Sequence, residues 1–266
     1  MKIGIVGLGL IGGSILKNLV NTEHEILAVT RNKVTLDKIK DLVLNCSSDY
    51  GILSNADLVF VCTPIHKVLE TLDKLENIVS PRCIVTDVAS VKIFVTKKKR
   101  PYKFIPSHPM AGTENSGFDY SFKELFQGAK WVITPYDSLE INVLQNLIEK
   151  MGAKTIVTTA KEHDEAVALI SHMPMYISQC LFDIAKDNKL AMMLASSGFR
   201  DTTRLAMTDL NLAKDMLSFN GNNIDEYLSV FIDKLKSLKK EYNSQKLTEI
   251  KSIRKKMYSD DGKNII

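Results

Sequence analysis

The sequence lacks an apolar run of the roughly 18 residues that a membrane-spanning helix needs. It also lacks paired cysteines: the four present are dispersed, with no C-x-x-C pair, so neither a disulfide framework nor a zinc site is expected. The 45% hydrophobic and 25% charged residues give the composition of an ordinary soluble protein. We therefore expect a folded protein with no membrane segment and no bound metal. The cysteines are Cys46, Cys62, Cys83 and Cys180.

Signals for export and for nucleic-acid binding are also missing. The first residues hold a single lysine followed by glycines, without the charged segment and cleavage site of a signal peptide, which predicts a cytoplasmic protein. The net charge of +4 comes largely from residues 97–100 and the lysine-rich C-terminal segment. Neither run is interleaved with aromatic residues or gathered along one helix, so both are interpreted as solvated helix ends. No nucleic-acid partner is expected.

The chain of 266 residues is long enough for two separate cores. Short β-type runs alternate with helical stretches up to about residue 158, which predicts βαβ units and a largely parallel sheet with helices on both faces. The remaining pattern is helical, with breaks near 195–203 and 219–223. We expect an α/β domain over residues 1–158 and an all-helical domain over 159–266. The expected strands lie in 2–6, 25–30, 56–62, 82–88, 102–107, 130–135 and 154–159.

The segment 163–186 is apolar around most of its helical circumference. A helix on the outside of a monomer is apolar on one stripe only, so this one must be covered on several sides. A helical domain of the expected size is small for that task. The hypothesis that follows is a homodimer formed through the C-terminal helices.

A glycine-rich stretch follows the first expected strand and opens the first expected helix. Gly7 permits a tight turn, Gly9 lets the backbone approach a pyrophosphate, and Gly12 lets the helix pack closely on the strand. The phosphates would lie at the helix N-terminus, beside Leu10 and Ile11. The α/β domain is therefore expected to be of the Rossmann type and to bind a dinucleotide.

The end of the second strand bears on the choice of dinucleotide. An acidic residue there would bind a free ribose 2′-hydroxyl, but the strand ends in Thr30, followed by Arg31. A guanidinium with a neighbouring hydroxyl can bind a 2′-phosphate, so NADP is favoured, with NAD as the alternative and stacking of Arg31 on the adenine as another use of that side chain. Thr63, which follows the 56–62 run, is also expected to line the cofactor site.

Polar residues follow two other expected strands, where Rossmann-type sheets bind ligands. Asp87, Ser90 and Lys92 come after one strand, and His108 and Thr113 come after the next. A neutral imidazole near a nicotinamide can accept the hydroxyl proton as hydride departs, which contributes roughly 10²- to 10⁴-fold in rate. His108 is therefore the candidate catalytic base, with a serine such as Ser90 holding its tautomer; a structural loop histidine is the alternative.

Four segments together resemble the signature segments of the prephenate/arogenate dehydrogenase family. They are "TDVASVK", "HPMAGTE", "HDEAVALISHMP" and "SSGFRDTTRLA", in that family's order and spacing, and the similarity extends from the glycine loop to about Ala206. The resemblance implies NAD(P)-dependent oxidative decarboxylation of prephenate to 4-hydroxyphenylpyruvate, or of arogenate to tyrosine. It implies that His108 hydrogen-bonds the ring hydroxyl and that Ser90 is its partner.

The same resemblance assigns residues to the substrate pocket. Thr113 and Glu114 fall in the loop that lines it, while Arg204 and Arg200 match basic residues that hold substrate carboxylate. The two arginines share one face if their turn is helical; ion pairing with Asp201 and Asp209 is the alternative. His172 is placed in the pocket, with a hydrogen-bonded core histidine as the alternative. A second histidine that some members carry is here Met175. His163 and Asp164 are interpreted as helix-start residues without a role.

Prephenate is taken as the substrate, with arogenate as the alternative. Glu114 could hold the ammonium of arogenate, or it could order Arg200 and gate the pocket for prephenate. The neutral strand end followed by Arg31 is similar to that of members that use NADP and prefer arogenate. Rival hypotheses are a reductase of the pyrroline-carboxylate or β-hydroxyacid kind and a nucleotide-sensing module without turnover. The first leaves "HPMAGTE" and the paired arginines unused, and the second predicts indifference to loss of His108.

Overall fold

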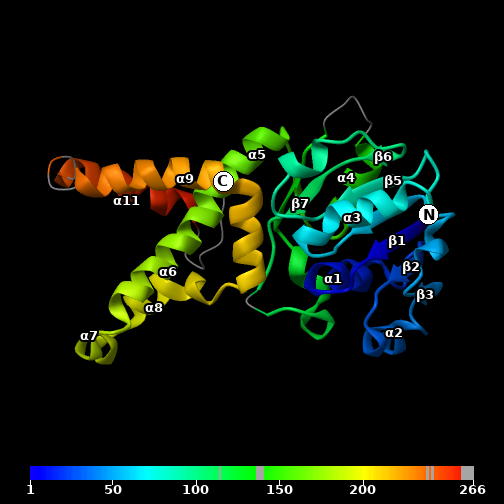
Figure 1. Cartoon of the computed structure of the whole chain (residues 1–266), viewed down its shortest axis with the longest axis horizontal. Coiled ribbons are helices and arrows are strands. Elements are labelled where there is room, and N and C mark those ends of the chain that lie inside the picture. Colours follow the sequence, from blue (N-terminus) through cyan, green and yellow to red (C-terminus); the bar gives the residue numbers. More distant parts are fainter. Residues whose placement is uncertain (114, 136–140, 238–239, 241–242, 259–266) are drawn as a thin grey trace. The chain divides into compact units, whose positions relative to one another are not determined.

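The computed structural model describes residues 1–113, 115–135, 141–237, 240 and 243–258. It divides into two compact units, residues 1–223 and 224–266. The first unit contains a parallel sheet with flanking helices and the first part of the helical region (Figure 1). The second contains the end of the long helix α9 and helix α11, Ser244–Met257. In the described part of the chain, none of the helices is both long and apolar enough to cross a bilayer.

The larger sheet has the strand order of a Rossmann-type fold. Its order is β3-β2-β1-β4-β5-β6, and all its neighbouring strands are parallel. The chain moves outward from β1 to β3 and then returns to the other side of β1, so the order reverses between β1 and β4. The strands are β1 (Lys2–Val6), β2 (Glu25–Val29), β3 (Asn45–Ser47), β4 (Leu58–Val61), β5 (Ile84–Asp87) and β6 (Lys103–Phe104).

Alternate residues of each strand enter two separate cores, one on each face of the sheet. Phe60 of β4 packs into the core that contains α1 (Leu10–Leu19) and α4 (Asn142–Lys150). Val61, the next residue, packs into the core that contains α3 (Ile65–Leu75). This two-sided burial explains why the strands are almost continuously apolar. The remaining helix of this region is α2, Lys33–Ile39.

A second, three-stranded sheet was not predicted. β7 (Ser107–Pro109) is antiparallel to β8 (Lys130–Ile133), which is parallel to β9 (Lys154–Val157). The run 102–107 was expected to be one strand, but β6 ends at Phe104 and β7 begins after Pro106. A proline has no N–H to donate to a ladder, which is one reason for the break. β3 was also missed, because three residues without an apolar run give little signal.

The chain becomes helical close to the predicted residue, but its helices are interrupted at more places than predicted. α5 (Ala160–Val167) starts from a capping box between Thr159 and Glu162. A π-helical turn, Ala168–His172, joins it to α6, so the apolar segment is not one regular helix. A non-helical residue, Asn220 (φ −132°, ψ 17°), interrupts α9 in the predicted break at 219–223. The other helices are α6 (Met173–Ala185), α7 (Lys189–Leu194), α8 (Ser197–Thr203) and α9 (Leu210–Lys236).

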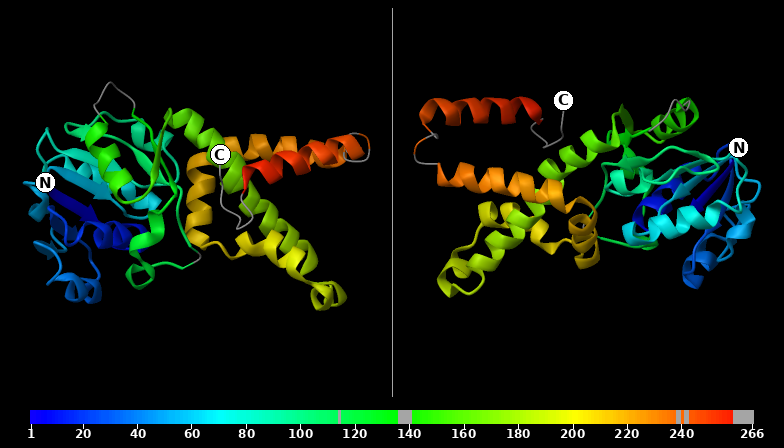
Figure 2. Two further views of the ribbon diagram at one scale, coloured as in Figure 1. Left: turned by 180° about the vertical axis from the view of Figure 1, so that it is seen from behind. Right: turned by 45° about the horizontal axis from the view of Figure 1, so that its top comes forward.

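The views in Figure 2 show α6 and α7 extending from α5 within the first unit. Several large apolar side chains on these helices are exposed in the single chain. Ile184 is 81% exposed and Met193 is 82% exposed. The residues that the structure describes therefore do not bury this segment on several sides, as had been expected.

Candidate active site

The glycine turn has the geometry that dinucleotide binding requires. Gly7, directly after β1, has φ +90°, and a Cβ there would lie 2.7 Å from the Cys62 carbonyl oxygen. A Cβ on Gly12 would lie 2.0 Å from the Gly7 carbonyl oxygen, so α1 packs against the turn at a distance that only glycine allows. A Cβ on Gly9 would meet nothing within 4 Å. The turn is therefore tight on its protein side and open where a phosphate would approach.

The N-terminus of α1 is available to a ligand. Gly9 caps this helix without a side-chain hydrogen bond, and the helix begins with Leu10 and Ile11. The first N–H groups of a helix have no intrahelical partner, and the helix dipole favours negative charge there. These residues therefore fit the pyrophosphate of a dinucleotide.

The other predicted cofactor residues lie at the carboxyl ends of neighbouring strands. Thr30 follows β2 and donates its N–H to the Ser47 carbonyl at 3.1 Å, and Arg31 is exposed beside it. Thr63 follows β4, and its hydroxyl is 3.4 Å from that of Thr71. The residues after β1, β2 and β4 thus share the edge of the sheet at which the strand order reverses.

His108 lies on β7 and is linked to two residues of α5. Its Nδ1 is 2.9 Å from Nε2 of His163, and Nδ1 of His163 is 2.8 Å from Oδ1 of Asp164. His163 is 2% exposed and Asp164 is completely buried. His163 and Asp164 do lie near the start of α5, as predicted, but both are buried and hydrogen-bonded, which the sequence did not lead us to expect. Val167 lies on the same buried helix face one turn later, and that periodicity could have marked His163 as buried.

A buried ion pair supports the strand that carries His108. Nζ of Lys92 pairs with Asp87 and also donates to the Ser107 carbonyl at 2.7 Å. Both charged side chains are 0% exposed. Burial is the largest influence on both groups: it raises the pKa of Asp87 and lowers that of Lys92, and their mutual attraction opposes each shift. The peptide before His108 is thus fixed by a charged group.

His108 is held in its neutral form. Burial lowers its pKa well below the usual value of 6.5, and positive charge on His163, Lys92 or His172 would lower it further. An unprotonated imidazole is the form that can accept a proton from a substrate hydroxyl.

Contrary to the prediction, Ser90 does not hydrogen-bond His108 and so does not hold its tautomer. His163 occupies the Nδ1 side of the ring. The hydroxyl oxygen of Ser90 is buried and has no hydrogen-bond partner among the described residues. Since a buried hydroxyl normally has a partner, that group is available to a ligand.

His172 lies in the π-helical turn and is 1% exposed. Its Nδ1 is 3.2 Å from Nδ2 of Asn220, the residue at the break in α9, and Nδ2 of Asn220 also donates to the Asp164 carbonyl. Burial lowers the pKa of His172 to about 4, so the ring is neutral at pH 7. Its Nε2 is buried and has no partner among the described residues. A hydrogen-bonded core histidine, the alternative named above, explains the contact of Nδ1 but gives no partner for Nε2.

The predicted substrate-binding arginines are not part of this buried network. Arg200, on α8, is exposed, and its Nε is 2.9 Å from Asp201, which is the ion pair named as the alternative. Arg204 begins a 3-10 turn, Arg204–Met207, and is exposed as well. Thr113 is exposed and bonds to Asn115. Glu114 lies outside the described residues.

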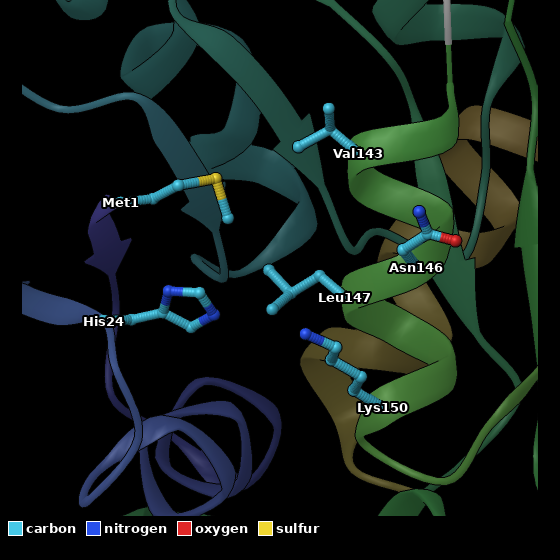
Figure 3. A pocket seen from close by; sticks show the side chains of 6 residues that line it. All are labelled: Met1, His24, Val143, Asn146, Leu147 and Lys150. Carbon is cyan, nitrogen blue, oxygen red and sulfur yellow. The ribbon is translucent and has the colours of Figure 1, made fainter.

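A separate shallow hollow lies on the opposite edge of the sheet. Figure 3 shows the side chains of Met1 and His24 on one side of it and those of α4 on the other. Met1 precedes β1 and His24 precedes β2, so the hollow is at the amino ends of the strands. Ligands of Rossmann-type sheets bind beyond the carboxyl ends, and the hollow is therefore distinct from the candidate active site.

The strand order, the glycine turn and the half-buried candidate base together are those of a Rossmann-type dinucleotide-binding oxidoreductase. Residues 16–157 match the nucleotide-binding domain of prephenate dehydrogenase, and residues 159–256 match its dimerization domain. The chain belongs to the prephenate dehydrogenase family, whose members also include enzymes named for arogenate. It is accordingly an NAD(P)-dependent oxidoreductase, and the expected family and fold class are confirmed.

Individual relatives cover nearly the whole chain. Cyclohexadienyl dehydrogenase of Zymomonas mobilis is 30% identical over 260 residues, 91% of this chain and 89% of the relative. Prephenate dehydrogenase of Lactococcus lactis is 29% identical over 99% of this chain and 76% of its own. Among solved structures, arogenate dehydrogenase of Synechocystis has a TM-score of 0.81 and 36% identity, covering 96% of this chain and 97% of that one. Prephenate dehydrogenase of A. aeolicus, in complex with hydroxyphenyl propionate and NAD+, has a TM-score of 0.82 and 25% identity, with the same coverage.

Proposed function

We propose that the protein catalyses oxidative decarboxylation of prephenate to 4-hydroxyphenylpyruvate, a step of tyrosine biosynthesis. The observation that carries the proposal is His108, which is half-buried and neutral and whose Nδ1 is hydrogen-bonded to His163. That arrangement leaves Nε2 of His108 for the substrate hydroxyl. The same chain has a glycine turn and a helix N-terminus that fit a dinucleotide. The relatives named for prephenate in Lactococcus lactis and Bacillus subtilis support this substrate.

For this reaction the protein must supply a base and groups that bind the substrate carboxylates. A dinucleotide held by the glycine turn and the N-terminus of α1 would supply the acceptor for the hydride on C4 of the ring. His108 takes the proton of the C4 hydroxyl, and the electrons of the breaking C1–carboxylate bond make the ring aromatic as carbon dioxide leaves. The free hydroxyl of Ser90 is in the same loop region as Lys92 and can donate to the ring oxygen.

Substrate carboxylates require cations, and Arg204 is proposed as the principal one. A guanidinium contact with carboxylate contributes about 1.5–3 kcal/mol as a charged hydrogen bond. Arg200 is assigned a secondary role, since binding substrate would compete with its pairing to Asp201. Thr113, Glu114 and the free Nε2 of His172 are proposed to line the same pocket.

Arogenate is the second candidate substrate. It differs from prephenate only in bearing an amino group in place of the side-chain ketone. The 36% identity to the arogenate dehydrogenase of Synechocystis favours it. Assays with both substrates therefore belong in the first experiment.

NADP is proposed as the preferred cofactor, because the exposed Arg31 follows a strand end without a carboxylate. The variant Arg31→Asp tests this. It is expected to lower kcat/KM with NADP and to leave or raise kcat/KM with NAD. An equal loss with both cofactors would contradict binding of a 2′-phosphate by Arg31.

A homodimer through the C-terminal helices is proposed for the solution state. The match of residues 159–256 to the family's dimerization domain supports it. The exposure of Ile184, Met193 and Leu194 in the single chain supports it as well, because such apolar side chains are normally covered. We propose a division into functional domains at about residue 158; the separate family matches to residues 16–157 and 159–256 support it.

The decisive experiment is an absorbance assay of dinucleotide reduction with purified protein. Prephenate and arogenate are each supplied with NADP and with NAD. Prephenate-dependent reduction, with 4-hydroxyphenylpyruvate as product, is expected. Binding of a dinucleotide without turnover of either substrate would overturn the proposed function.

A further inference from the structure

The carboxylate of Asp164 is a fixed hydrogen-bond acceptor. Its Oδ1 accepts the backbone N–H of Lys92 at 2.7 Å, and its Oδ2 accepts that of Ile93 at 2.8 Å. Backbone N–H groups can only donate, so both oxygens are acceptors, which is the role that a carboxylate offers. Nδ1 of His163, 2.8 Å from Oδ1, is therefore the donor in that contact.

The donor and acceptor roles in this contact also determine the tautomer of His108. A neutral His163 with its proton on Nδ1 has a lone pair on Nε2, which can only accept. Nδ1 of His108, 2.9 Å away, must then carry the proton, and Nε2 of His108 is left unprotonated toward the substrate. The contact that selects the tautomer of the base thus originates at Asp164.

Charged groups lie close to the His108–His163 pair. The charges that act on this pair of rings include those of Asp164, Lys92 and, when protonated, His172. Lys92 is cationic and buried, and Asp164 is already stabilised by two backbone N–H groups. When a proton arrives from the substrate, the added positive charge beside Lys92 is therefore stabilised by the carboxylate of Asp164.

The position of the pair is fixed by the fold. The capping box at Thr159 sets where α5 begins, and Nδ2 of Asn220 donates to the Asp164 carbonyl at 2.8 Å. Asp164 in turn joins α5 to the turn that starts at Lys92. The geometry around His108 therefore depends on contacts among three segments that are distant in the sequence.

We propose that His163 and Asp164 form a positioning dyad that keeps Nε2 of His108 unprotonated and stabilises the positive charge while His108 holds the substrate's hydroxyl proton. The proposal rests on the proposed function and goes beyond it in assigning these two residues. Both act through His108 and neither is placed against the substrate.

The balance of the reaction explains why such a dyad is needed. The hydroxyl proton moves to Nε2 of His108 as hydride leaves C4 with its electron pair. The C1–carboxylate bond then breaks, and its electrons pass through the ring to the oxygen, which becomes a phenolate. The phenolate takes the proton back from His108, so no net proton is released. The enzyme must hold the proton between the two events, and the carboxylate of Asp164 stabilises the cation through His163.

Two variants and one control test the dyad in the full-length protein. Asp164→Asn removes the charge, and His163→Gln keeps an acceptor for Nδ1 of His108 but cannot share a proton. In Ser-His-Asp enzymes, loss of the orienting carboxylate lowers kcat about 10⁴-fold; here, a loss of at least about 10-fold is expected in each variant, mainly in kcat rather than KM. Glu165→Gln, on the exposed side of α5, is the matched control and is expected to retain wild-type kinetics.

A second measurement does not depend on turnover. Nitrogen-15 NMR of labelled histidines distinguishes the two tautomers of His108 in the substrate-free protein. The Nδ1–H form is expected in wild type and in His163→Gln, and a mixture or the other form is expected in Asp164→Asn. The acid limb of the kcat profile is expected to move in both variants, which a purely structural role would not produce.

The outcomes separate this proposal from the proposed function. Wild-type kcat in His163→Gln, or an Nε2–H tautomer of His108 in the wild type, would overturn the dyad. If wild type turns over neither substrate but shows the Nδ1–H tautomer and its loss in Asp164→Asn, the proposed function fails while the positioning contact stands. If Asp164→Asn does not fold, His163→Gln still decides, because it leaves the backbone contacts of Asp164 intact.

Discussion

Replacing Gly9 by alanine is predicted to weaken dinucleotide binding without destabilising the protein. A Cβ at this position meets nothing within 4 Å, and its φ of −89° is available to alanine. The free energy of unfolding should therefore change by less than about 1 kcal/mol. The new methyl group, however, occupies the open side of the turn where the pyrophosphate approaches. Losing one charged hydrogen bond of about 1.5–3 kcal/mol would weaken binding by about 10- to 150-fold.

The matched comparison is Gly12→Ala. There the Cβ would lie 2.0 Å from the Gly7 carbonyl oxygen, which is backbone and cannot move aside alone. This variant is expected to lose about 1–3 kcal/mol of stability as well as affinity. Fluorescence titration with the reduced dinucleotide gives Kd, and urea unfolding gives stability. Unchanged affinity in Gly9→Ala would refute the assignment of this turn as the phosphate site.

Four further predictions follow from the buried groups and the exposed helices. Lys92→Met leaves Asp87 buried without its partner, so urea unfolding should show a loss of about 3–5 kcal/mol; an unchanged midpoint would count against the ion pair. The lowered pKa of His108 keeps the base unprotonated, so kcat/KM of the wild type should fall only below about pH 6.5. Below that pH the unfolded chain protonates His172 before the folded one does, so the wild type should lose about 3 kcal/mol more stability by pH 4 than His172→Gln, as measured by denaturant titration. Ile184→Asp should convert the proposed dimer to monomers in sedimentation, and a monomeric wild type would contradict the interface.

Local sequence patterns were sufficient to predict most of the strands. Each run expected to contain a strand does contain one, since period and composition within a few residues determine strand formation when both faces are buried. The division of 102–107 between two sheets was not predictable, because the direction of β7 depends on its pairing with β8, more than twenty residues later. The glycine turn was predicted in detail, because backbone conformation and close packing there depend on residues near in sequence.

By itself the sequence determined the Rossmann-type domain and the helical region and identified His108 as the candidate base, because glycine spacing, hydrophobic period and short motifs are local properties. Only the tertiary structure decided which residue hydrogen-bonds the ring of His108. His163 is 55 residues away along the chain, and its contact with His108 exists because Asp164 bonds to the peptides of Lys92 and Ile93 on another segment. Ser90, nearer in sequence, has no bond to that ring in the structure. A hydrogen bond forms between groups that folding brings together, and no pattern of neighbouring residues specifies it.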